Sequence, residues 1–331
     1  MKLLNVFLSI SCAAILFISC DGGGFLSASS TANEVLVIMD ENAWEGSAGR
    51  ALFDVLNSPA KGLPQIEPNF KILQITPNNF TSTFKMARNI IVPEISNLYS
   101  APKISSEIDK YAMGQVIMTI KAPDSASFSN FVTQNSDAII NYILNKELER
   151  TADWLIKSSG TPQTRIQQVF GINMHYPKGI SNIEEENNFY WATNNAPQSR
   201  RDIVIYQFPY TSEKVFEKDS LIAIRDSVLG KYITGSNNSV MKTAMVPYQP
   251  EYKKMDLNGL FRAELRGLWE MTNDMMGGPF VMHAFVNEQT NMVIIAEVFV
   301  YAPETNKRNL IRNMEASLYT INIPEKKSEN N

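Results

Sequence analysis

The sequence is poor in cysteine and histidine, with 2 residues of each type among 331. Thiolate and imidazole groups are the usual protein ligands of transition metals, so we expect no metal site. Cys12 lies inside a hydrophobic leader and Cys20 ends it, so the mature chain keeps one cysteine and cannot form an internal disulfide. His175 and His283 each stand in a strand-like stretch, and we interpret both as structural or surface residues.

The chain also lacks the motifs that hold common cofactors or activate common nucleophiles. It has no glycine-rich phosphate loop of the Walker or dinucleotide type and no Gly-x-Ser-x-Gly elbow. Gly277-Gly278-Pro279 is more simply a turn between two strands. Ser-x-x-Lys occurs several times, but both residue types are common enough here for chance matches. We therefore expect no cofactor, and the sequence assigns no catalytic residue.

Positive charge is not in excess, because 30 Lys and Arg stand against 34 Asp and Glu, for a formal net charge of −4. The basic residues form no stripe, so nucleic acid is not expected as a partner. Beyond the leader there is no second membrane span. The best apolar run, residues 292–302, is short and is interrupted by Glu297.

The first residues follow the order of a bacterial lipoprotein signal. Lys2 precedes the apolar stretch Leu3 to Ile18, and the small residue Ser19 stands directly before Cys20. We predict that residues 1–19 are a signal peptide and that Cys20 is acylated after cleavage. Two or three acyl chains hold a protein to a bilayer far more firmly than one. The alternative is an ordinary secretory signal with a chance cysteine.

Composition then predicts a tether, a folded body and a tail. Residues 20–32 are rich in glycine and serine, which predicts a flexible tether with a mean reach of roughly 20 Å. Residues 323–331 form a polar tail. Between them, the length suits two domains, which we place at 33–160 and 161–322. The predicted location is the cell envelope, on the outer membrane or facing the periplasm, with the lipid bilayer as a partner through Cys20.

The two halves repeat similar features in the same order, which predicts an internal duplication. Each half has a β-rich run followed by an amphipathic helix, then a further strand, an arginine that opens an apolar run, and a strand that ends at Ala-Pro-acid. The alternative is chance reuse of common strand and helix signals. The corresponding segments are 34–39 and 202–206, helices 44–56 and 219–232, strands 71–75 and 242–246, Arg88 and Arg266, and Ala122-Pro123-Asp124 and Ala302-Pro303-Glu304.

Strands that cluster beside long helices without regular alternation predict an α+β fold, with a mixed or antiparallel sheet and packed helices in each half. Two segments are harder to assign. Arg165 to His175 and Asn188 to Thr193 are predicted as strands around the polar loop SNIEEENN. Leu260 to Met271 fits both period 2 and helical spacing, and the proposed duplication favours a helical turn to Leu265 followed by a strand from Arg266.

Three strings in the chain resemble a known family. They are NEVLVIMDENAW near the start, RGLWEMTNDMMGGPFV (Arg266 to Val281), and VYAPETNKRNLIRNMEASLYT near the end. Together they resemble a family of Bacteroidetes lipoproteins that is catalogued as domain of unknown function 4837. The resemblance covers nearly all of the mature chain and implies an envelope lipoprotein. It supplies no substrate, cofactor or catalytic residue.

Arg88 and Arg266 stand at matching points of the two halves and are candidate ligand or interface residues. They could converge on a carboxylate, phosphate or sugar in a cleft between the halves, with Trp269 as a stacking platform. The alternative is structural: each arginine pairs with an acid, such as Glu264, and Trp269 belongs to the core.

Ser125 is a candidate site of O-glycosylation. It follows Asp124 and precedes an alanine, which resembles the Asp-Ser/Thr-aliphatic acceptor sequence of exported Bacteroidetes proteins. The alternative reading of the same residues is helix capping by Asp124.

These features favour a non-catalytic envelope lipoprotein that binds a partner or ligand near the membrane. The enzyme question stays open, and the alternative is a hydrolase of envelope glycan or peptide that uses carboxylates, with or without His175 or His283. That alternative requires a deep cleft in which two acids or a histidine converge. A purely structural spacer is the third hypothesis.

Overall fold

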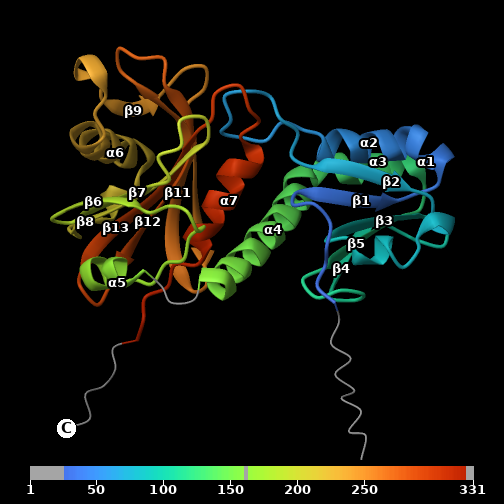
Figure 1. Cartoon of the computed structure of the whole chain (residues 1–331). Coiled ribbons are helices and arrows are strands. Elements are labelled where there is room, and N and C mark those ends of the chain that lie inside the picture. Colours follow the sequence, from blue (N-terminus) through green and yellow to red (C-terminus); the bar gives the residue numbers. More distant parts are fainter. Residues whose placement is uncertain (1–25, 160–162, 326–331) are drawn as a thin grey trace, which may run out of the picture.

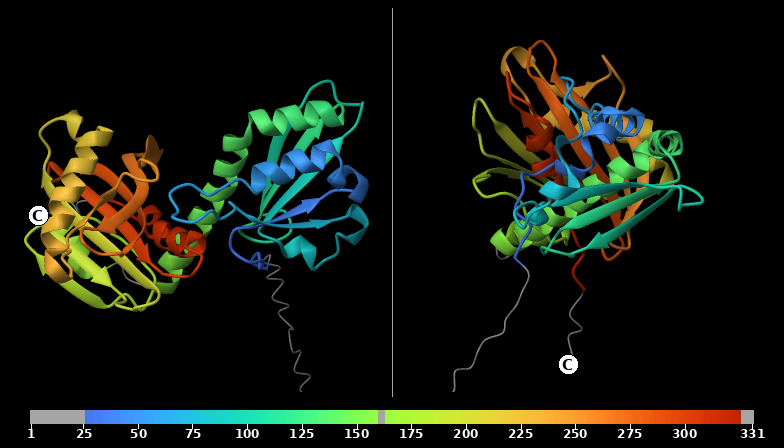
Figure 2. Two further views of the ribbon diagram at one scale, coloured as in Figure 1. Left: turned by 90° about the horizontal axis from the view of Figure 1, so that it is seen from above. Right: turned by 90° about the vertical axis from the view of Figure 1, so that its right-hand side faces the viewer.

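The computed structural model describes residues 26–159 and 163–325. Two sheets form two halves that lie side by side and are joined by a long helix (Figures 1 and 2). The predicted signal peptide and Cys20 lie outside the described residues. None of the described helices is long and apolar enough to span a bilayer.

The first half is a five-stranded sheet in the order β2-β1-β3-β5-β4, in which β4 alone runs antiparallel to its neighbour. Parallel strands need crossover connections and are covered on both faces, which fits the nearly continuous apolar runs of the central strands. The strands are β1 (Glu34–Ile38), β2 (Lys71–Ile75), β3 (Asn89–Ile95), β4 (Lys103–Ile108) and β5 (Val116–Ala122). The helices are α1 (Glu41–Glu45), α2 (Ser47–Leu56), α3 (Ser125–Gln134) and α4 (Ser136–Ser159), with short 3-10 turns η1 (Pro77–Asn79) and η2 (Phe84–Met86).

The second half is an antiparallel sheet in the order β10-β11-β12-β13-β8-β7-β6, with β9 paired to β11. Its strands are β6 (Asn182–Glu186), β7 (Phe189–Thr193), β8 (Arg200–Pro209), β9 (Met241–Ala244), β10 (Glu251–Leu257), β11 (Leu260–Met271), β12 (Gly277–Asn287) and β13 (Met292–Tyr301). Its helices are α5 (Thr164–Phe170), α6 (Lys218–Tyr232) and α7 (Arg308–Tyr319), with 3-10 turns η3 (Glu213–Phe216) and η4 (Ser236–Asn238).

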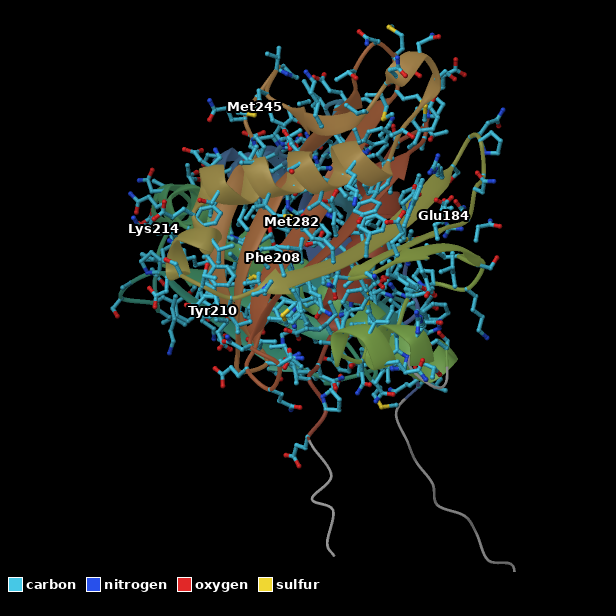
Figure 3. All side chains as sticks on the ribbon, turned by 90° about the vertical axis from the view of Figure 1, so that its left-hand side faces the viewer. Glu184, Phe208, Tyr210, Lys214, Met245 and Met282 are labelled. Atoms are coloured by element: carbon cyan, nitrogen blue, oxygen red, sulfur yellow. The ribbon has the colours of Figure 1, made fainter. Side chains whose placement is uncertain are left out.

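Helices cover both faces of the second sheet. α5 and α7 pack on one face, and α6 packs on the other. Figure 3 shows α6 crossing the sheet, with the fully buried Met282 beneath it and the exposed Glu184 at the outer edge of the sheet. Long central strands with two covered faces are apolar along most of their length, as in β13, where eight consecutive residues are buried.

The predicted α+β fold in two halves is confirmed, with a mixed sheet in the first half and an antiparallel sheet in the second. The two halves share the order of several elements along the chain, but their strands pair differently. β1 is separated from β5 by β3, whereas β8, which matches β1 in the proposed duplication, pairs directly with β13. Common ancestry of the halves therefore stays a prediction.

The prediction of a strand from Arg165 to His175 is wrong. Residues 164–170 form α5, which ends at Gly171 with a left-handed backbone, φ 65°. Ile166 and Phe170 lie one turn apart on the buried side of this helix, a spacing that suits a short helix better than a strand. The loop SNIEEENN was expected between strands; its acidic residues instead form the exposed strand β6.

The helical turn predicted before Leu265 is also wrong, because Leu260–Met271 is one continuous strand. Alternate residues of β11 point to opposite faces of the sheet, and helices cover both faces. Side chains on both faces are therefore buried, which weakens the alternation of polar and apolar residues that identifies a strand. The predicted turn at Gly277-Gly278-Pro279 is the start of β12. A Cβ atom at Gly278 would lie 2.0 Å from the Val300 carbonyl oxygen, so close strand packing requires glycine there.

The last residues of the predicted tether are bonded to the first half, so they do not belong to a flexible segment. Ala28 donates its backbone N–H to Met113 O (2.9 Å), and Ser29 donates to Met86 O (2.9 Å). The Ser30 hydroxyl accepts the backbone N–H of Arg88 at 3.0 Å. The glycine and serine composition did not reveal these contacts, since they depend on partners far along the chain.

A loop of the first half, residues 57–69, reaches across to the second half, and we call it the arm. It joins α2 to β2 and extends toward α7 (Figure 1). Leu63 of the arm is buried in the hydrophobic core of the second half, and the Tyr248 hydroxyl donates a hydrogen bond to its carbonyl oxygen. The arm therefore fixes the two halves against each other.

Candidate ligand-binding cleft

A cavity of about 930 Å³ lies between the two halves. One wall comes from α2, the arm and the start of α4, and the other comes from β10, β11 and α7. Apolar side chains such as Val55, Ile140 and Ile311 alternate with polar groups along both walls. A cleft between the halves was one of the two alternatives that the sequence left open, although it did not indicate most of the residues that line this cavity.

The lining carries more positive than negative side chains. Among the residues that the structure describes, six cationic and four acidic side chains face the cavity. The acids are Asp54, Asp137, Glu251 and Glu264, and the cations are Arg50, Lys61, Lys253, Arg266, Arg308 and Arg312. Each half supplies both signs of charge, so a ligand in this cleft would contact both halves.

Arg266 is the predicted site residue that lines the cavity. Its guanidinium donates hydrogen bonds to the carboxylates of Glu315 and Glu264. Burial alone would lower the pKa of Arg266, but the two carboxylates outweigh burial and place the pKa above its usual range. Gly62 of the arm packs against this side chain, since a Cβ there would lie 2.7 Å from Arg266 Cγ. Its charge is therefore largely committed to internal partners.

Glu264 stands at the centre of this charged group. Burial acts to raise its pKa, but Arg266, His283 and Lys253 together hold that pKa well below its usual range. An ionised carboxylate can only accept hydrogen bonds, so His283 donates from Nε2 to Glu264 Oε2 at 3.3 Å. Lys253 Nζ lies 3.2 Å from the same oxygen. Glu264 is thus a fixed negative charge and cannot act as a proton donor in the cleft.

Arg312 of α7 lines the cavity and links the two halves. It donates to Asn33 Oδ1 at 2.9 Å, to Asn69 O at 2.6 Å and to Asn69 Oδ1 at 2.9 Å. Burial lowers the pKa of Arg312 to about 9, which leaves it charged at neutral pH. Asn33 in turn donates its backbone N–H to the buried carboxylate of Glu147 at 3.2 Å.

The structure does not bring Arg88 and Arg266 together. Arg88 does not line the cavity, and its guanidinium lies 3.6 Å from Glu147 Oε2 inside the first half. Trp269 is 2% exposed and lies on the opposite face of the second sheet, where Nε1 donates to Val300 O at 3.3 Å. The functional reading of a shared site with Trp269 as platform is therefore wrong, and the alternative of acid-paired arginines and a core tryptophan holds. The physical reason is strand alternation, which turns Arg266 and Trp269 to opposite faces.

Neither histidine lines the cavity. His283 is fully buried, and burial lowers its pKa, so the ring is neutral at pH 7. His175 is also buried, and its Nδ1 lies 2.5 Å from the Ser159 hydroxyl. Within residues 26–159 and 163–325, no group of His, Cys, Asp and Glu is arranged to hold a metal ion. Both histidines thus fit the structural reading.

Ser125 is the first residue of α3 and is exposed. Asp124 is the N-cap of this helix and accepts the backbone N–H of Ser127 at 2.8 Å. The capping interpretation is correct for Asp124, and an exposed acceptor hydroxyl is compatible with modification. Glycosylation of Ser125 stays a prediction.

Sequence reasoning missed the arm and the polar residues of α7. A signal was present in α7, because Glu315 falls on the same helical stripe as Ile311 and Leu318. A charged residue on a buried stripe requires a partner of opposite charge. The sequence could not reveal which of its arginines supplies that partner.

Family models match the two halves separately. Residues 159–320 match the model described as domain of unknown function DUF4837. The second half belongs to this family. Residues 28–155 match a different model, domain of unknown function DUF8532. The expected resemblance to family 4837 is therefore confirmed for the second half, and its extension over nearly all of the mature chain is wrong. The cavity therefore lies between a DUF8532 domain, which supplies α2, the arm and α4, and a DUF4837 domain, which supplies β10, β11 and α7.

No curated protein matches the chain. Solved structures with weak similarity include two of the protein Mog1. A mutant of the protein Mog1 is 8% identical, with a TM-score of 0.32, over 47% of this chain and 92% of that one. The Saccharomyces cerevisiae Ran-binding protein Mog1p is 10% identical, with a TM-score of 0.30, over 46% of this chain and 90% of that one.

Proposed function

We propose that the protein is an envelope lipoprotein that binds a small, negatively charged ligand in the cleft between its two domains. The observation that carries this proposal is the cavity of about 930 Å³ with six cationic and four acidic side chains among its described lining residues. This volume falls in the range of small-molecule sites. Arg266 is committed to Glu264 and Glu315, but the lining residues Arg308 and Arg312 form no ion pair among the described residues, and such cations favour ligands that carry carboxylate or phosphate groups.

Fixed contacts between the two domains favour binding, because the ligand then does not have to offset the entropy lost when the site becomes ordered. Leu63 fills part of the DUF4837 core, and the arm salt bridge joins Lys61 Nζ to Glu251 Oε2 at 3.4 Å. Arg312 adds buried hydrogen bonds to the DUF8532 domain. A ligand that enters a preformed cleft does not have to bring the walls together, so more of its interaction energy appears as affinity.

The leader supports the location. The order of charge, apolar run, small residue and Cys20 is that of a lipoprotein signal, so the proposed partner at this end is the lipid bilayer. The proposed place is the cell envelope, on the outer membrane or facing the periplasm. A binding protein held there would capture its ligand close to the membrane surface.

The chemistry of the cleft favours binding over hydrolysis. Glu264 is held ionised by its cationic neighbours and cannot donate a proton. His175 and His283 are both buried away from the cavity. The proposal is a non-catalytic binding protein, and Asp54, Asp137 and Glu251 are the remaining cleft acids that the hydrolase alternative would use.

Calorimetric titration of the mature chain with citrate and with inorganic pyrophosphate tests the cleft. The double variant Lys61→Ala/Lys253→Ala removes two half-exposed cations and leaves Glu251 and Glu264 without these partners. We expect at least one of the two anions to bind with a Kd in the millimolar range or below, and the double variant to weaken binding about tenfold, or about 1.4 kcal/mol.

Lys242→Ala is the matched control, because Lys242 forms a similar exposed pair with Glu270 at 3.0 Å and does not line the cavity. It should leave the affinity unchanged. Absence of binding for both anions, or equal weakening by the control, would overturn the proposed anionic site.

A further inference from the structure

One end of the DUF8532 domain carries exposed apolar side chains around the start of the described chain. Leu26 is 74% exposed, Met113 53%, Ile108 55% and Trp154 59%. We call these four residues the proximal surface. Scattered apolar residues are ordinary on protein surfaces, so their arrangement relative to one another and to Cys20 decides their meaning.

Hydrogen bonds bring these residues together from three segments. Met113 donates its backbone N–H to Leu26 O at 2.9 Å, so the start of the chain lies on the turn between β4 and β5. Ile108 is the last residue of β4 and borders the same turn. The start of the chain and this turn lie on one side of the molecule, below β4 in Figure 1.

Trp154 lies on α4, about one helical turn beyond a residue that contacts the same turn. Arg150 of α4 donates from Nε to Gly114 O, the residue after Met113, at 2.5 Å. Residues four apart in a helix lie on the same side, so Trp154 continues the side that Arg150 presents to the turn. Of the four tryptophans in the chain, Trp44 and Trp269 are buried and Trp191 is partly buried, which leaves Trp154 as the exposed one.

The length of chain before Leu26 identifies the occupant of this surface. From Cys20 to Leu26 the backbone can span at most roughly 20 Å, at 3.3–3.6 Å per residue. If Cys20 is acylated, Leu26 and the turn around Met113 must lie within this distance of the bilayer. Tryptophan is enriched at membrane–water interfaces. The transfer of apolar side chains out of water into such an interface lowers the free energy.

We infer that the proximal surface rests on the lipid bilayer and sets the orientation of the anchored protein, an inference that relies on the lipidation of Cys20 included in the proposed function. The anchor supplies the affinity, and the surface restricts rotation about the anchor. Within α4, the residues that line the cleft end at Leu144, ten residues or about 15 Å before Trp154, so the cleft is held above the membrane surface.

The test uses the acylated full-length mature protein in vesicles of phosphatidylethanolamine and phosphatidylglycerol with brominated acyl chains. The emission of Trp154 is isolated as the difference between this protein and its Trp154→Phe variant. We expect the Trp154 emission to shift to shorter wavelength on reconstitution, to be quenched by the brominated lipid and to become at least threefold less accessible to acrylamide.

A matched pair of variants separates the surface from general apolarity. Ile108→Ser/Met113→Ser should restore at least half of the acrylamide quenching of Trp154. The control Leu98→Ser/Met275→Ser removes side chains that are 88% and 100% exposed, on the β3–β4 loop and in the DUF4837 domain, and should change nothing.

The outcomes distinguish this inference from the proposal on which it relies. If the mass of the purified protein shows no acyl chains on Cys20, the anchor itself is wrong. If Cys20 is acylated but Trp154 keeps the acrylamide quenching and emission of the detergent-free Cys20→Ala protein, the proximal surface does not face the bilayer and the inference is overturned.

Discussion

Glu67 of the DUF8532 domain caps the first turn of α7 in the DUF4837 domain. Its Oε1 accepts the backbone N–H of Lys307 at 2.6 Å, and its Oε2 accepts that of Arg308 at 3.1 Å. The first N–H groups of a helix have no partner within the helix, so a carboxylate placed there satisfies them and also interacts favourably with the helix dipole. Here the capping group comes from 240 residues away in the sequence, which makes the cap a joint between two domains.

Replacing Glu67 by Ala should destabilise the protein because one buried and one partly buried N–H group lose their partner. We expect the free energy of unfolding to fall by about 1–3 kcal/mol, the usual cost of a lost cap or an unsatisfied buried donor. Urea denaturation followed by circular dichroism measures the change. Glu45→Ala is the control, because Glu45 forms only an exposed pair with Arg50 at 3.7 Å, and it should cost less than about 0.5 kcal/mol.

The two predicted site arginines should differ in their contribution to stability. Arg266→Met leaves the buried carboxylates of Glu264 and Glu315 without their main cation, so we expect a loss of about 3–5 kcal/mol. Arg88 is more exposed, and its guanidinium lies 3.6 Å from the carboxylate of Glu147. Without Arg88, Glu147 would still be paired with Arg150. Arg88→Met should therefore cost about 1 kcal/mol or less. Equal losses in thermal or urea unfolding would contradict this assignment of roles.

Stability should fall on mild acidification, and His283 should contribute to the loss. Burial lowers its pKa below the ordinary value of 6.5, so the unfolded chain binds a proton that the folded chain does not. The contribution is present above pH 6.5 and is lost as pH falls below that value. Unfolding measured between pH 7.5 and about pH 5 should show a shallower decrease for His283→Gln than for the unchanged protein. Parallel curves for the two proteins would mean that His283 is not the titrating group.

Ser125 is predicted to carry a glycan when the protein is exported by a bacterium with Asp-Ser/Thr-aliphatic glycosylation. Its hydroxyl is exposed at the start of α3, so the folded protein does not hide it. The intact mass of the exported protein should exceed that of its Ser125→Ala variant by a glycan. Because Asp124 alone supplies the cap, this substitution should leave the stability nearly unchanged. Equal masses, after correction for the lost hydroxyl oxygen, would rule out the modification at this residue.

Much of the secondary structure was predictable where a segment is apolar on one face or on both. The helix predicted over 219–232 is α6, Lys218–Tyr232, and the strand predicted over 71–75 is β2. Prediction failed for β11, because its two covered faces blur the alternation of polar and apolar residues that identifies a strand. It also failed at Gly278, where glycine serves close contact with Val300 in a strand and not a turn.

The candidate site was predictable only in outline. The sequence indicated two domains and pointed to Arg266, which does line the cavity. It gave no means to choose between the two roles of that arginine, since the decisive partner, Glu315, lies 49 residues away on α7. Trp269 could not be assigned to the core until strand alternation had fixed which side of the sheet it faces.

By itself, the sequence determined two features that depend on local order: an α+β composition and the residues that match DUF4837. Only the tertiary structure decided that the arm crosses between domains, that Glu67 caps α7 and that the cleft has a cationic excess. The physical reason is that burial and ion pairing depend on distances in space. Those distances are set by packing between segments that are hundreds of residues apart in the chain.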